Sequence, residues 1–254
     1  MLLGKIIILG EIEIISGLHI GGATTGLKIG GVDLSVIVDS EGKPYIPGSS
    51  LKGKTRSLME HRLGKINSNG KVHMCKKDDD YKNCPICLIW GISPTEKDMN
   101  IDLPVYSRLI VRDIPLKEES IKKMKSLELE WTEVKTENVI NRMKGSAESP
   151  RQIERVPAGA VFSPMEMVYN VFEEEDKKNL KYVFEALELL EHDYLGGMGS
   201  RGYGKVEFRN IKIYWNKKED YEEGRLNQRL INEEFNTPSL IVANFDKILS
   251  KLQS

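Results

Sequence analysis

The sequence has little cysteine, with three residues among 254. So small and odd a number cannot build a disulfide framework, and we expect a reducing compartment, by default the cytoplasm. Long apolar runs are also missing, because Lys5, Glu11 and Glu13 interrupt the apolar stretch from Leu2 to Ile15, and no small-residue cleavage site follows it. We therefore expect neither a signal peptide nor a membrane partner.

An excess of charge of one sign is absent as well. The 37 Lys and Arg residues are balanced by 38 Asp and Glu residues, which gives a formal net charge of -1. This balance argues against a protein that is coated with positive charge and binds any nucleic acid. Positive charge is instead concentrated locally, since the segment from Lys52 to Lys65 carries many basic residues and a single acid, Glu60. Such a surface favours one defined polyanion as the partner.

Internal repeats and low-complexity tracts are missing too, and hydrophobic periodicity is the signal that remains. A period of two, typical of strands, occurs over Lys5–Ser16, Leu34–Val38, Pro164–Phe172 and Lys205–Trp215. Apolar steps of three and four residues, typical of helices, occur over Leu51–Leu63 and Leu180–Leu190. Strand, helix and strand at both ends predict an α+β fold, a ferredoxin-like (RRM-like) sheet in a single domain over residues 1–254.

Two segments break this pattern, residues 67–100 and residues 117–158, and we interpret both as insertions. In the first, Cys84 and Cys87 form a C-x-x-C pair that places two thiolates on one turn, and His73 and Cys75 can complete a tetrahedron. Four protein ligands leave no open position, so the spacing predicts a structural zinc ion. The alternative is a set of ordinary thiols beside a surface histidine.

Residues 48–55 match the Walker A pattern, so a P-loop NTPase is a remote alternative for the function. However, Pro44 and Pro47 stand where a P-loop needs a buried parallel strand. If Ser49 or Ser50 caps a helix here, only a helix N-terminus remains. Its N–H groups and the nearby lysines would then suit RNA phosphates.

A glycine-rich stretch from Gly196 to Lys205 combines backbone amides with Arg201 and Lys205 for phosphate binding and Tyr203 as a candidate stacking ring. The alternative is a flexible connection between a helix and a strand.

Asp33 follows two glycines in Gly30-Gly31-Val32-Asp33. Its carboxylate can approach a ligand, and it could bind a divalent cation or orient a 2′-hydroxyl for in-line attack. By itself this pattern is more often a turn. No Ser/His/Asp arrangement and no pair of carboxylates at a catalytic spacing stands out elsewhere in the sequence.

Taken together and in this order, four stretches resemble the RAMP superfamily. They are Gly17-Leu18-His19-Ile20-Gly21-Gly22, Gly31-Val32-Asp33, Pro44-Tyr45-Ile46-Pro47-Gly48-Ser49-Ser50-Leu51-Lys52-Gly53-Lys54, and Leu195-Gly196-Gly197 through Gly202-Tyr203-Gly204-Lys205. Within that superfamily the chain is most similar to the repeated backbone subunits of type III-A, or Csm, CRISPR effector complexes. The resemblance is carried by the two ends of the chain.

The resemblance implies an RNA-recognition-like palm with a projecting thumb, expected by position over Glu133–Pro157. Several copies would stack in a filament along a guide crRNA beside other Csm subunits. It also implies metal-dependent cleavage of complementary target RNA at regular intervals, with Asp33 as the catalytic residue. The metal would be weakly held Mg2+ or Mn2+, and the product would carry a 2′,3′-cyclic phosphate. The alternative is a scaffold subunit that binds RNA without cutting it.

The local patterns and the resemblance together define the residues that we expect to contact RNA. They are His19, Ser49, Ser50, Lys52, Lys54, Arg56, Lys135, Arg142, Arg151, Arg155, Arg201, Tyr203 and Lys205.

Overall fold

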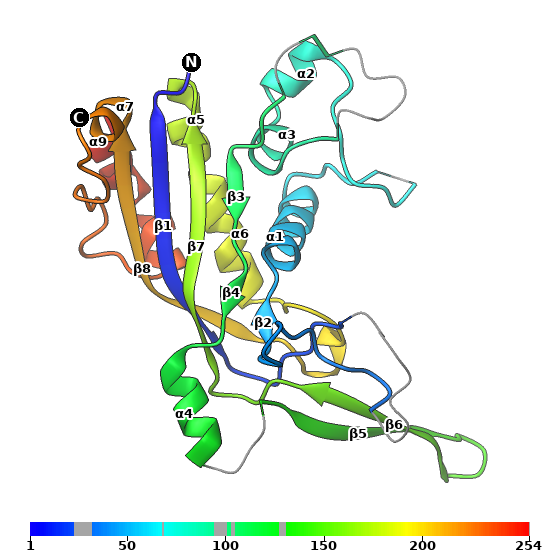
Figure 1. Cartoon of the computed structure of the whole chain (residues 1–254). Helices are drawn as coiled ribbons and strands as arrows, with labels where there is room; N and C mark the ends of the chain where they lie inside the picture. Colours follow the sequence, from blue (N-terminus) through cyan, green and yellow to red (C-terminus); the bar gives the residue numbers. More distant parts are fainter. Residues whose placement is uncertain (23–31, 68, 94–100, 103–104, 127–130, 254) are drawn as a thin grey trace.

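The central strand of the molecule is β1 (Gly4–Ile14), whose even-numbered isoleucines are buried on one face. The computed structural model describes residues 1–22, 32–67, 69–93, 101–102, 105–126 and 131–253. β1 pairs antiparallel with both β7 (Val161–Val171) and β8 (Val206–Lys217), and β3 (Leu109–Val111) pairs with β7. The strand order is therefore β3-β7-β1-β8 (Figure 1). The strands predicted from alternation are confirmed for β1, β7 and β8, with ends displaced by a few residues.

Helices cover one face of this sheet (Figure 1). α1 (Gly48–Arg62) contacts α6 (Lys181–Glu191), and both predicted helices are confirmed. Leu51 and Phe184 are among their fully buried side chains, and each such burial contributes about 1.5–3 kcal/mol. The remaining helices of this layer are α5 (Glu174–Asn179), α7 (Lys218–Glu222), α8 (Pro238–Ala243) and α9 (Phe245–Gln253). The fold is mixed α/β with an antiparallel sheet, and no helix among the described residues is long and apolar enough to span a membrane.

The start of α1 differs from the prediction. Pro47 occupies the position before the helix, and the N–H of Gly48 donates to Asp113 Oδ1 at 2.8 Å. Asp113 is brought there by the pairing of β2 (Tyr45–Ile46) with β4 (Ile114–Pro115). The prediction that Ser49 or Ser50 caps the helix is therefore wrong, because the capping carboxylate comes from a residue distant in sequence.

The predicted strand over residues 34–38 is also wrong. Alternate residues of this segment make single bridges with three different parts of the chain: Leu34 with Ile153, Val36 with Gly21, and Val38 with Pro44. A strand needs one neighbour along its length, and this segment has three. Residues 34–38 therefore connect three separate parts of the chain through single bridges.

The two segments that we interpret as insertions stand apart from the sheet (Figure 1). The first contains α2 (Asp78–Lys82) and α3 (Pro85–Trp90), which share a small hydrophobic core of their own. The second contains α4 (Glu118–Ser126) and a hairpin of β5 (Glu133–Ile140) and β6 (Ala147–Arg155). The hairpin projects from one end of the molecule, and its outer part, including Met143, is exposed.

Candidate functional site

The base of the β5–β6 hairpin holds the segment that contains Asp33. β6 lies between β5 on one edge and residues 33–36 on the other: Leu34 N–H donates to Gln152 O at 3.3 Å, and Glu154 N–H donates to Leu34 O at 3.0 Å. The N–H of Gln152 also donates to Asp33 Oδ2 at 2.8 Å. The side chain of Asp33 is exposed. Its carboxylate is thus held by strand backbone while it faces solvent.

His19 reaches the same edge of β6. Its Nδ1 lies 2.7 Å from the carbonyl oxygen of Glu154. A carbonyl can only accept, so we assign the proton to Nδ1, which leaves Nε2 of the neutral ring as an acceptor. Asp33 and His19 are attached to β6 two residues apart, which is about 7 Å of extended strand. One strand therefore positions both side chains.

The glycine-rich stretch packs against His19. Gly197 N–H donates to the carbonyl oxygen of His19 at 2.8 Å. Gly196 has a φ of 78°, and a β-carbon there would lie 2.3 Å from the same oxygen. These contacts require glycine, and they make the stretch a packed support of His19 in place of a flexible connection.

Tyr203 is 1% exposed and lies between two cations. Lys135 Nζ is 4.5 Å and the guanidinium carbon of Arg155 is 5.1 Å from the centroid of its ring. Burial, followed by the carboxylate of Glu137, raises the pKa of Tyr203. The structure corrects the expectation that this ring stacks on an RNA base, because the ring is enclosed by protein.

Acidic residues of β5 partly neutralise the same cations. Glu137 pairs with Lys135 and with Arg201, each at 3.3 Å, and Glu133 pairs with Arg155 at 2.7 Å. The ion pair between Glu137 and Arg201 therefore links the hairpin base to the glycine-rich stretch. The sequence placed Lys135 and Arg155 in this segment and Arg201 in the glycine-rich stretch, but it did not show their acidic partners.

The other expected RNA contacts are placed as follows. Arg142, Arg151, Lys205 and Ser49 are exposed, and Ser50 is half-buried in the first turn of α1. Within the described part of the chain, the three basic residues of this group have no acidic partner. Gly30 and Gly31, which precede Asp33 in its motif, lie outside the described residues.

The Walker A match does not form a phosphate-binding loop. The backbone is helical from Gly48 onward, and Asp113 takes the first N–H of the helix. The lysine of the pattern, Lys54, pairs with Asp193 at 3.1 Å, and its Nζ lies 3.7 Å from the ring centroid of Tyr194. A P-loop needs free N–H groups and a free lysine, so this geometry contradicts the NTPase alternative.

Lys52 also differs from expectation. Its Nζ donates to Ser107 Oγ at 2.9 Å and to Leu109 O at 2.7 Å. Burial, followed by the charge of Arg56, lowers the pKa of Lys52. This ammonium group joins α1 to β3, and we no longer count it among the RNA contacts.

The predicted convergence of His73, Cys75, Cys84 and Cys87 is confirmed. Their ligand atoms lie within 4.8 Å of one another, and His73 Nε2 is 3.4 Å from Cys84 Sγ and 3.6 Å from Cys75 Sγ. Tetrahedral zinc with bonds of about 2.0–2.3 Å places its ligand atoms about 3.5–3.8 Å apart. The four residues therefore fit one metal ion with small adjustments.

The thiols of this cluster share protons. The hydrogen bond with Cys87 lowers the pKa of Cys84 to about 4, and burial raises the pKa of Cys75 to about 11. The hydrogen bond with Cys84 also raises the pKa of Cys87. A cation bound among them would stabilise all three thiolates and displace the remaining protons.

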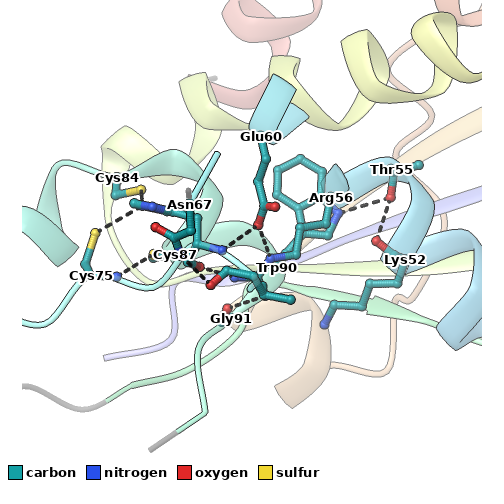
Figure 2. Close-up of polar contacts among 12 residues, drawn as sticks. Lys52, Thr55, Arg56, Glu60, Asn67, Cys75, Cys84, Cys87, Trp90 and Gly91 are labelled. Carbon is teal, nitrogen blue, oxygen red and sulfur yellow. Dashed lines mark hydrogen bonds and ion pairs between the residues drawn. The ribbon is translucent and has the colours of Figure 1, made fainter. Parts of the chain in front are cut away.

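Arg56 and Glu60 of α1 form the hydrogen bonds that connect this cluster to the helix (Figure 2). Arg56 donates to Gly91 O at 2.8 Å and to His73 O at 2.6 Å, and its Nε pairs with Glu60 at 2.9 Å. Glu60 also accepts the N–H of His73 at 3.2 Å. Arg56 is thus a structural link between α1 and the His/Cys cluster, which corrects its assignment as an RNA contact.

We expect Arg56→Ala to lower the free energy of unfolding by about 2–3 kcal/mol, because it leaves partly buried carbonyl groups without a donor. Arg62→Ala is the matched control on the same helix. Its guanidinium is half exposed and pairs with Glu185 at 3.3 Å, so its loss should cost less than about 1 kcal/mol. Urea unfolding of both variants measures the difference. Equal losses would contradict the structural role of Arg56.

Sequence reasoning missed two acids that organise the site: Glu137, and Glu154, whose Oε2 accepts the N–H of Val36 at 2.8 Å. Each lies in a polar segment where one acid looks like any other solvated acid. The alternating exposure of residues 133–137 was not visible there, because both faces of the strand carry polar side chains.

Three comparisons place the chain among known proteins. The family model described as the RAMP superfamily matches residues 11–207. "CRISPR system Cms endoribonuclease Csm3" of Methanocaldococcus jannaschii is 43% identical over 247 residues, which cover 96% of this chain and 94% of the relative. The protein of the same name from Streptococcus thermophilus is 38% identical and covers 84% of this chain and 90% of the relative.

Two solved structures agree with these relatives. A chain in the crystal structure of a Csm3–Csm4 subcomplex of the type III-A CRISPR-Cas interference complex is 34% identical, with a TM-score of 0.60 over 97% of both chains. The crystal structure of Methanopyrus kandleri Csm3 is 22% identical with a TM-score of 0.64 over 98% of both chains, which shows a shared fold. The chain therefore belongs to the Csm3 proteins of the RAMP superfamily.

Proposed function

We propose that this chain is a guide-RNA-binding backbone subunit of a type III-A CRISPR effector complex and that it cleaves complementary target RNA at Asp33. The observation that carries the proposal is the exposed carboxylate of Asp33, held on β6 at the base of a projecting hairpin. It occurs in a chain 43% identical to a Csm3 endoribonuclease. Geometry and relatedness thus support the same activity.

The architecture supports the assembly that this function needs. The strand order β3-β7-β1-β8, with α1 after the first strand and α6 after the third, is the order of a ferredoxin-like palm. The β5–β6 hairpin is the proposed thumb. Copies stacked along a guide crRNA beside other Csm subunits would present one thumb, and one Asp33, at each repeat.

In this proposal Asp33 acts on the reacting ribose, and His19 helps to hold the segment that carries Asp33. The Asp33 carboxylate takes the proton of the 2′-hydroxyl of the target as the 2′-oxygen attacks the adjacent phosphorus. The bond from phosphorus to the 5′-oxygen breaks, the 5′-oxygen takes a proton from water, and a 2′,3′-cyclic phosphate forms. Asp33 Oδ2 is held by the Gln152 amide, so the carboxylate is oriented before RNA arrives. His19 is 6% exposed and its ring is held by the carbonyl of Glu154, so we assign it a supporting role: the residues that follow it pair with Ser35 and Ile37 of the Asp33 segment. The carboxylate that takes the proton and the imidazole that supports its segment are thus both hydrogen-bonded to β6.

A divalent ion is the second component that the proposal needs. Besides the His/Cys cluster, the described residues contain no group of three or more such ligands, so Asp33 alone does not hold Mg2+ or Mn2+. Mg2+ is commonly bound by one or two carboxylates together with substrate phosphates, which fits an ion that arrives with RNA. When bound, it would stabilise the charge on the phosphate.

Zinc is the proposed occupant of the His73, Cys75, Cys84 and Cys87 cluster. Three thiolates and one imidazole form a closed tetrahedral set, which suits zinc and leaves no position for substrate. The small core around α2 and α3 contains few residues, so a metal would supply stability that packing alone does not. Its role is structural.

A reconstituted complex tests the function directly. The chain, assembled with its native partner subunits and guide, should cut a matched target RNA at regular intervals with added Mg2+ or Mn2+. The 5′ fragments should resist poly(A) extension until their cyclic phosphates are removed. Uncut target bound stably by the complex would instead favour the scaffold alternative.

Salt dependence tests the proposed RNA surface. The double variant Arg151→Ala, Lys205→Ala should weaken RNA binding and reduce the slope of log Kd against log salt by about 1.4, since each contact with single-stranded RNA contributes about 0.7. Lys218→Ala is the matched control, because α7 lies at the end of the sheet opposite the hairpin (Figure 1). Equal slopes for the double variant and the parent would remove these residues from the RNA surface.

A further inference from the structure

We infer that Glu154 is a positioning residue for RNA cleavage, which holds the Asp33 segment on the thumb at the point where strand pairing stops. This inference rests on the proposed function. It concerns a side chain that we do not place in contact with RNA but that connects the Asp33 segment with the hairpin and with His19. The contacts of its backbone and of its carboxylate carry the argument.

The pairing between the Asp33 segment and β6 is short. It consists of the two hydrogen bonds of Leu34 with Gln152 and Glu154. In a parallel ladder the N–H of Val36 would donate next to the carbonyl oxygen of Glu154, but that oxygen accepts the Nδ1–H of His19. Beyond the end of β6, Val156 pairs with Leu18. The N–H of Val36 is therefore left without a strand partner.

The carboxylate of Glu154 replaces that missing partner. Its Oε2 accepts the N–H of Val36 at 2.8 Å, and Val36 is 5% exposed. A buried N–H without an acceptor is costly, so the segment would shift to satisfy it. Asp33 lies three residues before Val36, and any such shift moves its carboxylate relative to the RNA.

The second carboxylate oxygen of Glu154, Oε1, also accepts a hydrogen bond. Thr132 Oγ1 donates to Glu154 Oε1 at 2.5 Å, and Thr132 directly precedes β5. The carbonyl of Glu154 also accepts the Nδ1–H of His19. One residue thus connects both hairpin strands, the Asp33 segment and His19, so the angle of the hairpin and the position of the carboxylate are coupled through it.

The test compares variants in the reconstituted complex under single-turnover conditions with saturating target RNA. Glu154→Ala should cut roughly a hundredfold more slowly, the effect of a displacement of about 1 Å, while the Kd for target RNA stays within about twofold. Glu154→Gln keeps an oxygen that can accept the N–H of Val36, and its amide N–H can donate to Thr132 Oγ1. Its rate should therefore stay within about threefold of the parent. A general loss of stability would not produce this rescue.

Glu148→Ala is the matched control, since Glu148 lies on β6, is exposed and accepts a hydrogen bond from Asn141 at 2.9 Å. It should cut at the parent rate. If Glu154→Ala does not assemble, Thr132→Val decides, with an expected loss of about tenfold. Parent-like cleavage by Glu154→Ala or Thr132→Val, or a Glu154→Gln variant as slow as Glu154→Ala, would overturn the inference. Failure of the proposed function would look different, because the parent complex itself would not cut RNA.

Discussion

Asp33→Ala should abolish cleavage by the assembled complex, with a fall in the single-turnover rate of at least about a thousandfold. The reason is that the carboxylate is exposed and is oriented at the base of the hairpin by the Gln152 N–H, and its loss removes both charge and orientation from the reacting ribose. Guide and target binding should be unchanged, since the exposed carboxylate would repel phosphate rather than attract it. Gel analysis of labelled target with filter binding separates the two effects.

Two further variants locate the cause. Asp33→Asn keeps an oxygen that can accept the Gln152 N–H but lacks the charge, so it should be nearly as inactive as Asp33→Ala. Asp39→Ala is the matched control, because Asp39 is an exposed aspartate in the same region that caps its own turn through Glu41 and Lys43. It should cut normally. An Asp33→Ala complex that cuts at the parent rate would establish the scaffold alternative.

Loss of one metal ligand is the second change with a large expected effect. The protein should purify with about one equivalent of zinc, and Cys84→Ser should carry little. The metal contributes binding free energy to folding, so the segment around α2 and α3 should lose stability on the order of 5–10 kcal/mol and unfold locally. Amide exchange should then rise over residues 73–90 while β1 stays protected.

Histidine variants provide the control for this prediction. His73→Ala should lower zinc content, because Nε2 of His73 lies between two of the thiols. His61→Ala should leave zinc content unchanged, since His61 is exposed near the end of α1. Parent protein that contains no zinc, or a Cys84→Ser variant that keeps a full equivalent, would contradict the cluster as a metal site.

The site was only partly predictable, and the basic residues of α1 show why. Lys52, Lys54 and Arg56 look alike in the sequence, as cations on a helix that follows Pro47 and Gly48. In the structure the ammonium group of Lys52 donates to Leu109 O, and that of Lys54 pairs with Asp193. The guanidinium of Arg56 donates to carbonyl groups beside the His/Cys cluster. A sequence shows that a cation is present, but it does not show which distant acceptor lies within hydrogen-bonding distance.

The sequence by itself determined the strands β1, β7 and β8, the helices α1 and α6, and the four residues of the His/Cys cluster. These features depend on periodicity and on short spacing, which act between neighbours in the chain. Only the tertiary structure decided that Asp113 begins α1, that Tyr203 is enclosed, and that Asp33 and His19 share one edge of β6. Those outcomes depend on hydrogen bonds and charges between residues far apart in sequence, and such partners are selected when the whole chain packs.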